Sequence, residues 1–297
     1  MAVCDKQRKS TISGICSVGL LWAAAFCGCD RSHSDVDISP ALPDASDATS
    51  TVEPAPGNAD PRMLQTFAEA TRADAPDDWQ RPPDVTMTGK SVGTLYSEVV
   101  KNWDRLRVVG DKGQMLQCTA GLETELGTIE ITLRPDLAPN HVRNFIVLAQ
   151  LGYYDGLVFE RIVHARFEEQ PDKEVDLIEA GCPLGTGEVG LGSLGYWLKQ
   201  EFSKEPHEAG TVSACHSADP DTAACRFYIT LNKAPFLDGN FTVFGKVTKG
   251  LEVARKIFSL PVRNDPEYPE SDRPQKPVVI RKVTIVISDP DSGKAVR

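Results

Sequence analysis

The fold class is decided by residues 126–133, which read LGTIEITL. Ile129, Ile131 and Leu133 alternate with polar residues, and a period of two is typical of a strand with one buried face. Pro139 then suits the first position of a helix, because a helix start leaves its amide hydrogens unbonded and proline has none. A strand followed closely by a helix is therefore expected to begin a folded domain.

Strand-like and helical patterns continue beyond this unit. Val142, Phe145 and Leu148 form one apolar stripe of the helix, and Gly152 ends it. Many strands with two helices and tight turns favour a mainly β domain built as a closed or nearly closed antiparallel barrel. The further strands are expected at 157–163, 211–215, 227–231, 242–247 and 278–287, and the second helix at 251–258.

The first 29 residues have the three parts of an export signal: a basic start, an apolar run at 12–26 and small residues before Cys29. The last four, Phe-Cys-Gly-Cys, are similar to a bacterial lipobox, in which the final cysteine is lipid-modified. Phe26 stands where Leu is usual, so ordinary signal cleavage and a retained anchor stay open as alternatives. We expect an exported bacterial lipoprotein, held on a membrane through Cys29 and facing the periplasm or the cell exterior.

Between the signal and the barrel lie two segments of different composition. Residues 30–62 are rich in Asp, Pro, Ala, Ser and Thr and poor in large apolar side chains, which predicts a disordered acidic linker. Residues 63–114 are predicted to be an N-terminal extension, which packs on the domain at 115–290 or forms a small separate unit. Its amphipathic helix is indicated by the spacing of Val92, Leu95, Val99, Trp103 and Leu106.

Charge argues against a nucleic-acid partner. The 42 acidic residues exceed the 32 basic ones, for a net charge of -10, and no cluster of Lys and Arg offers phosphates a binding face. The five histidines lack paired ligand spacing, so neither a metal nor another cofactor is expected.

Four of the eight cysteines lie beyond the lipobox: Cys118, Cys182, Cys215 and Cys225. In an exported protein they meet an oxidising compartment, where disulfides persist. Cys215 and Cys225 flank a turn-rich stretch and are the pair predicted to bond, with buried thiols as the alternative.

Several separated motifs stand in a recognisable order. Residues 152–162 read GYYDGLVFERI, residues 210–213 GTVS, residues 227–230 FYIT and residues 237–247 LDGNFTVFGKV. Together with residues 126–131, they resemble the cyclophilin family of peptidyl-prolyl cis/trans isomerases. The resemblance implies an eight-stranded antiparallel barrel capped by two helices.

The reaction that this resemblance implies has a definite chemical requirement. The amide before a proline turns slowly because its C–N bond has partial double-bond character, with a barrier of about 18–20 kcal/mol. Turnover in milliseconds needs an acceleration of roughly ten-thousandfold, or about 5.4 kcal/mol of transition-state stabilisation. A donor aimed at the prolyl nitrogen weakens that character. By the resemblance this donor is Arg161, whose guanidinium is permanently charged.

By the same resemblance, an apolar pocket grips the proline ring of a peptide segment from an exported protein. Phe241 stands where many members have His, and Phe236 where members sensitive to a cyclic peptide inhibitor have Trp. The pocket residues are Phe167, Leu177, Tyr228, Phe236, Leu237 and Phe241.

Three polar positions of the peptide site depart from the family. Glu179 replaces a Gln that orients the arginine, and Arg226 replaces a Gln that contacts the peptide backbone. His216 stands where the family has Asn or Arg. Glu179 is expected to pair either with Arg161 or with Arg226, and the sequence leaves both open.

The chain is also longer than usual ahead of the pocket. We interpret residues 167–174 as a charged, solvated loop, with a narrowed groove as the alternative. The added length leaves open whether Phe167 or Asp176 occupies the first position of the pocket.

Two functional hypotheses follow. In the first, the chain is a monomeric prolyl isomerase that assists exported proteins as they fold. In the second, the changed polar residues have weakened catalysis, and the barrel is a module that binds proline-containing peptides or a scaffold.

Overall fold

The computed structural model describes residues 64–74, 82–167, 170–187, 193–263 and 272–296. The expected signal at 1–29, with the lipid on Cys29, and the expected linker at 30–62 lie outside the described residues.

Eight antiparallel strands form one curled sheet in the order β10-β2-β3-β9-β7-β8-β5-β4. The edge strands β10 and β4 meet at one end, where the Phe159 N–H donates to the Val278 carbonyl over 2.9 Å. The mainly β, antiparallel prediction is confirmed. The strands are β2 Gln117–Thr124, β3 Gly127–Leu133, β4 Phe159–Phe167, β5 Gln170–Ala180, β7 Thr211–Ala214, β8 Phe227–Thr230, β9 Val243–Lys249 and β10 Ile280–Ser288.

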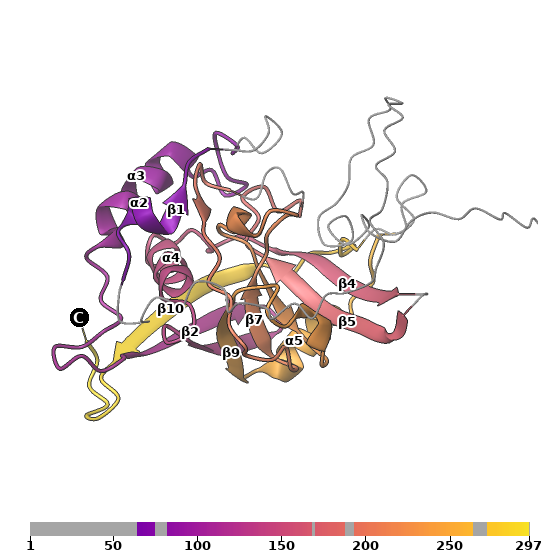
Figure 1. Ribbon diagram of the computed structural model, residues 1–297. Coiled ribbons are helices and arrows are strands. Elements are labelled where there is room, and N and C mark those ends of the chain that lie inside the picture. The colour runs from indigo at the N-terminus through magenta and orange to yellow at the C-terminus, as the bar shows by residue number, and fades with distance from the viewer. Residues whose placement is uncertain (1–63, 75–81, 168–169, 188–192, 264–271, 297) are drawn as a thin grey trace, which may run out of the picture.

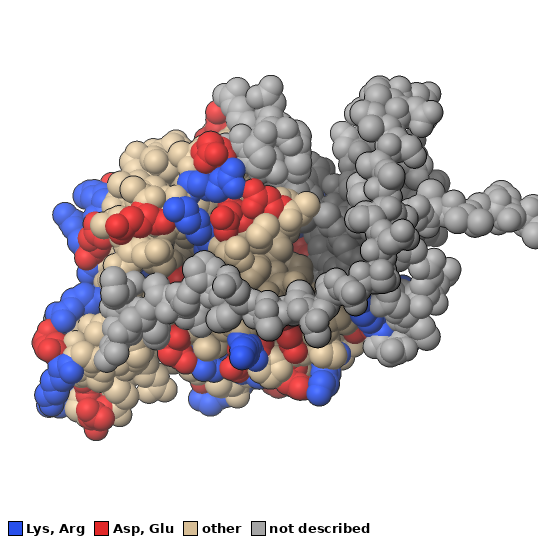
Figure 2. Space-filling model, viewed as in Figure 1, with Lys and Arg blue, Asp and Glu red and all other residues tan. Residues whose placement is uncertain are grey.

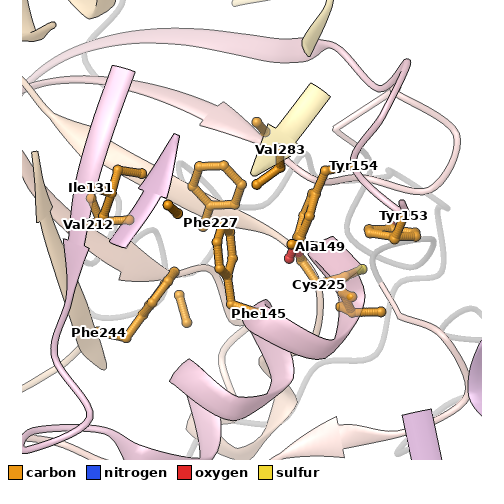
Figure 3. Packing of buried hydrophobic residues seen from close by; sticks show 14 of the residues in the cluster. Ile131, Phe145, Ala149, Tyr153, Tyr154, Val212, Cys225, Phe227, Phe244 and Val283 are labelled. Atoms are coloured by element: carbon orange, nitrogen blue, oxygen red, sulfur yellow. The ribbon is translucent and has the colours of Figure 1, made fainter. Parts of the chain in front are cut away.

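The two predicted helices are α4, Pro139–Gln150, and α5, Leu251–Phe258. Helix α4 is buried along nearly its whole length, and its Phe145 ring packs on Tyr154 and Phe227 with centroids 4.9 and 5.6 Å apart. Figure 3 shows these rings between α4 and the strands. The helix has no side-chain N-cap of its own. Instead, the Glu201 carboxylate accepts from the first backbone N–H groups of α4, which a buried helix end requires.

The N-terminal extension lies against α4 (Figure 1), and its Phe67 ring packs on the rings of Tyr96, Trp103 and Tyr196. Helix α3, Val92–Trp103, buries the predicted stripe except Leu106, which lies beyond the helix end and is half-buried. The Trp103 indole donates to the Gln65 carbonyl, and the Arg143 guanidinium lies 5.2 Å from the Trp103 ring centroid. The short elements α2, Phe67–Ala70, and β1, Thr71–Arg72, complete the extension, and β1 pairs with β6, Trp197–Leu198.

The charged segment before the pocket differs from the prediction. Residues 170–174 are not a loop but the start of β5, which pairs with β4 in a long hairpin. This hairpin projects from the body of the molecule in Figure 1. Arg166 there is exposed, Lys173 and Glu174 are half-buried, and the sequence of this end lacks the alternation by which strands are recognised.

The predicted disulfide is not formed. Cys215 and Cys225 are thiols in the structure, as are Cys118 and Cys182. Cys215 packs in the cluster around Tyr228, whereas Cys225 packs in the main core. The two side chains therefore serve different hydrophobic clusters, and the prediction of a bond between them is wrong.

Neighbouring valines on α3 test how firmly the extension is held. Val99 is fully buried, whereas Val100 is 39% exposed. Val99→Ala should destabilise the protein by about 2 kcal/mol through lost contacts and a cavity, and Val100→Ala by a few tenths. Urea unfolding at constant m-value measures both. Equal, small effects would show that the extension does not pack on the barrel.

Candidate active site

Arg161 lies in β4, where the alternation of the strand places it on the same face as Val163 and Ala165. Only 7% of its side chain is exposed. The loop after β5 covers the aliphatic stem, and a Cβ added to Gly187 would lie 2.8 Å from the Arg161 Cγ and Cδ. Gly187 also has φ +71°, so glycine suits this position twice over.

Glu179 holds two arginines at once. It faces Arg161 across the β4–β5 pair, and its Oε1 accepts from Arg161 Nη1 over 3.0 Å. Its Oε2 accepts from Arg226 Nη2 over 2.6 Å. Glu179 and Arg226 are 1% and 5% exposed, so these are buried, charge-assisted contacts. Both pairings that the sequence left open occur together.

Two further carboxylates, which the sequence analysis missed, complete the charged cluster. Glu160 is buried, accepts from the Cys182 N–H over 3.0 Å and lies 3.7 Å from Arg226 Nε. Asp272 approaches from the segment before β10, where its Oδ2 accepts from Arg161 Nε over 2.6 Å and also from Nη2. Glu160 is adjacent to Arg161 in sequence and could have been suspected. Asp272 is 111 residues from Arg161 in the sequence, and no sequence pattern connects the two.

Burial and charge act in opposite directions on these groups. Burial alone would lower the pKa of Arg161, but the carboxylates of Glu179 and Asp272 raise it above its ordinary value. Arg226 behaves alike, with Glu179 raising its pKa against burial. For Glu160, burial dominates and raises the pKa to about 7, although Arg226 opposes the shift. Arg161 is therefore a permanent cation within a compensated cluster.

An apolar cluster lies on the same side of the hairpin as Arg161. It brings together four of the predicted pocket residues, Leu177, Tyr228, Leu237 and Phe241, with Phe236 packed against them. Val163, Val175, Cys215 and Ala234 complete its buried members. Leucine, valine and aromatic side chains around one site suit the ring of proline.

Of the two alternatives for the first position of the pocket, Asp176 is not a member of the apolar cluster. Val175 packs in the cluster, whereas Asp176 points to the other face of the strand and pairs with His164. Phe167 ends β4, opposite Gln170, and its side chain lies outside the described part of the structure.

His216 enters the site mainly through its ring. It stacks on Phe241 with centroids 4.4 Å apart, at an angle of 24°. Its Nδ1 and Nε2 lie 2.7 and 2.8 Å from the carbonyl oxygens of Ser217 and Asn240. Both ring nitrogens are thus directed at backbone carbonyls of this chain.

A buried polar network supports the pocket from beneath. His207 Nδ1 lies 2.9 Å from Asp238 Oδ1, and its Nε2 lies 3.1 and 3.2 Å from the hydroxyls of Ser213 and Tyr228. Burial lowers the pKa of His207 against the opposing effect of Asp238, which favours a neutral ring that accepts from the hydroxyls. Ser213 is fully buried, so the network positions Tyr228 and offers no nucleophile to a substrate.

Among the described residues, His164, Glu174 and Asp176 bring their ligand atoms within 4.8 Å of one another. They lie on the hairpin face opposite Arg161, and no metal is needed to turn an amide bond.

On the visible face of Figure 2, Lys and Arg intermingle with Asp and Glu over the described residues.

The structure is thus a curled antiparallel sheet with a buried arginine beside an apolar cluster. Residues 119–285, more than half of the chain, match the family described as "Cyclophilin type peptidyl-prolyl cis-trans isomerase/CLD". The chain therefore belongs to the cyclophilin family and is a peptidyl-prolyl cis-trans isomerase.

Relatives come from fungi and bacteria. The Schizosaccharomyces pombe "Peptidyl-prolyl cis-trans isomerase ppi1" is 37% identical over 162 residues, which are 54% of this chain and 94% of that protein. The Brucella suis "Probable peptidyl-prolyl cis-trans isomerase" is 36% identical over 140 residues, 47% and 70% of the two chains. A solved Cryptosporidium parvum cyclophilin aligns with a TM-score of 0.47 and 22% identity, covering 59% of this chain and 99% of that one.

The raised pKa of Glu160 predicts a pH-dependent stability. The folded state binds the Glu160 proton more tightly than the unfolded chain, in which the pKa of Glu160 is near 4.5. The stability that protonated Glu160 contributes is therefore full below pH 4.5 and is lost as the pH rises through about 7. Glu160→Gln cannot titrate. Across that window, the wild type should lose up to about 3 kcal/mol relative to this variant.

Chemical unfolding at pH 5 and pH 8 makes the comparison, with Glu125→Gln, at an exposed position, as control. Parallel stability curves for wild type and Glu160→Gln would show that Glu160 does not carry the raised pKa.

Proposed function

We propose that Arg161 catalyses the cis/trans isomerisation of X-Pro bonds by donating a hydrogen bond to the prolyl nitrogen. A donor there localises the nitrogen lone pair and weakens the double-bond character that makes the barrier. The observation that carries the proposal is the placement of a 7% exposed guanidinium on the same hairpin face as the apolar cluster. A proline ring held by that cluster brings its nitrogen toward Arg161.

The substrates we propose are proline-containing peptide segments. The half-buried Phe236 and the edge of Phe241 offer the ring an apolar surface, backed by the buried Leu177, Tyr228 and Leu237. The network under Tyr228 holds that side chain in one position. A rigid pocket favours catalysis, because positioning lowers the barrier only when the reacting groups are held in place.

The changed polar residues are compatible with this activity when they are considered together. A Glu at 179 without an Arg at 226 would leave one carboxylate oxygen without its buried cation. An Arg at 226 without Glu179 would keep only Glu160, 3.7 Å from its Nε, as a partner. As a pair, they supply Arg161 with a carboxylate partner.

An Arg161→Ala variant tests the mechanism. It should lower kcat/KM for a short X-Pro peptide at least about a hundredfold, because the charged donor to the transition state is gone. Exchange NMR on residues 63–297 measures the rate. Arg166→Ala, an exposed arginine of the same strand, is the matched control and should retain full activity.

If the peptide binds but exchanges at the uncatalysed rate with wild type, the barrel is a proline-binding module and Arg161 has no catalytic role. Unchanged activity in Arg161→Ala would place the donor elsewhere.

We also propose that the enzyme is an exported bacterial lipoprotein that assists folding near a membrane. The support is the basic start, apolar run and lipobox-like Phe-Cys-Gly-Cys of residues 1–29, followed by an acidic, proline-rich segment. Within the described residues, no helix has the length and apolar character to cross a bilayer.

Mass spectrometry of the mature N-terminus after expression in a bacterium tests the anchor. A diacylated Cys29 is expected, together with fractionation into membranes, since two acyl chains give stable anchoring. Cys29→Ser should release the protein into the soluble fraction, whereas Cys27→Ser should not. A wild-type mature chain that begins elsewhere and carries no lipid would contradict the proposal.

A further inference from the structure

Asp272 belongs to an excursion of the chain between α5 and β10. The two arms of the excursion pair at Val262 and Pro274, and the Gln275 N–H donates to the Pro261 carbonyl over 2.8 Å. The returning arm lies against β4, the edge strand of the sheet, where the Ile162 N–H donates to the Asp272 carbonyl over 2.7 Å. The backbone of Asp272 is thus fixed independently of its carboxylate.

The Asp272 carboxylate binds the side of the Arg161 guanidinium that Glu179 does not contact. Glu179 binds Nη1, whereas Asp272 binds Nε over 2.6 Å and also Nη2. Gly187 packs on the aliphatic part of the Arg161 side chain. The side chain is therefore held at its aliphatic part and at two sides of its planar guanidinium. Glu179 alone would leave the plane of the guanidinium to turn about its contact at Nη1.

We infer that Asp272 is a positioning residue for prolyl isomerisation, which fixes the plane of the Arg161 guanidinium and so the direction in which it donates. The inference rests on the proposed function, in which Arg161 is the donor. An arginine on a flexible stem loses side-chain entropy when it is aimed at one atom. A carboxylate that holds it in place beforehand removes that loss from the reaction step.

A purely structural role would look different. If Asp272 served only to dock the excursion, its carbonyl bond to Ile162 and the pairing at Val262 and Pro274 would suffice. The carboxylate is 25% exposed and binds Arg161, so its removal leaves the docking contacts in place. Its effect should therefore appear in kcat and not in peptide binding.

The test compares Asp272→Ala, Asp272→Asn and the exposed Asp291→Asn as a charge-matched control in the full mature protein. We expect Asp272→Ala to lower kcat about tenfold with an unchanged Kd for the peptide, since the donor is still present but poorly aimed. Asp272→Asn, whose amide oxygen still accepts from Nε, should lie between Ala and wild type. Asp291→Asn should match wild type.

A second readout does not depend on activity. In wild type the Arg161 Nε–H should exchange slowly with water in 15N NMR, because it is buried and bonded to a carboxylate, and Asp272→Ala should speed this exchange. Faster exchange with unchanged or raised kcat would overturn the positioning role, as would slow exchange in both proteins. A kcat that is insensitive to Arg161→Ala would instead sink the proposed mechanism, while the exchange data still report on the Asp272 contact.

Discussion

The bridge of Glu179 between Arg161 and Arg226 is the interaction on which the site depends. A guanidinium that is 7% exposed needs a partner, because an isolated buried charge is unfavourable by several kcal/mol. One carboxylate serves two cations through its two oxygens. The remaining positive charge is met by Asp272 beside Arg161, whereas Glu160, whose pKa is raised to about 7, lies beside Arg226. The network compensates itself, so its members act as one unit.

Much of the barrel could be predicted from the sequence, since its signals are local. The alternation at 127–133 and the proline at the start of α4 predict elements that the structure contains. The start of β5 could not be recognised, because a strand that projects beyond the core has no buried face to impose a pattern. The Cys215–Cys225 disulfide failed for a related reason, because spacing does not show which cluster a side chain joins.

The residues of the site, too, could be predicted only where a local motif marks them. Arg161 and the pocket residues Leu177, Tyr228 and Leu237 follow from motifs, and the structure brings them to one side of the hairpin. The partners of Arg161 are a different matter. A sequence shows that a carboxylate exists but not which cation it meets, and Asp272 reaches β4 only through the tertiary path of the chain.

Assembly of the site is consequently coupled to closure of the barrel. Arg161 and Glu179 lie on adjacent strands and meet as the hairpin forms, but Asp272 lies just before β10, which pairs with β2 at the far edge of the sheet. The seam between β4 and β10, at Phe159 and Val278, is made by the same stretch of chain. Contacts of such sequence separation require closure of a long loop, and the entropy lost on closure is offset only once they are made. The guanidinium is therefore fully held only in the closed barrel, and a chain that has formed only the hairpin has the catalytic arginine without its second carboxylate.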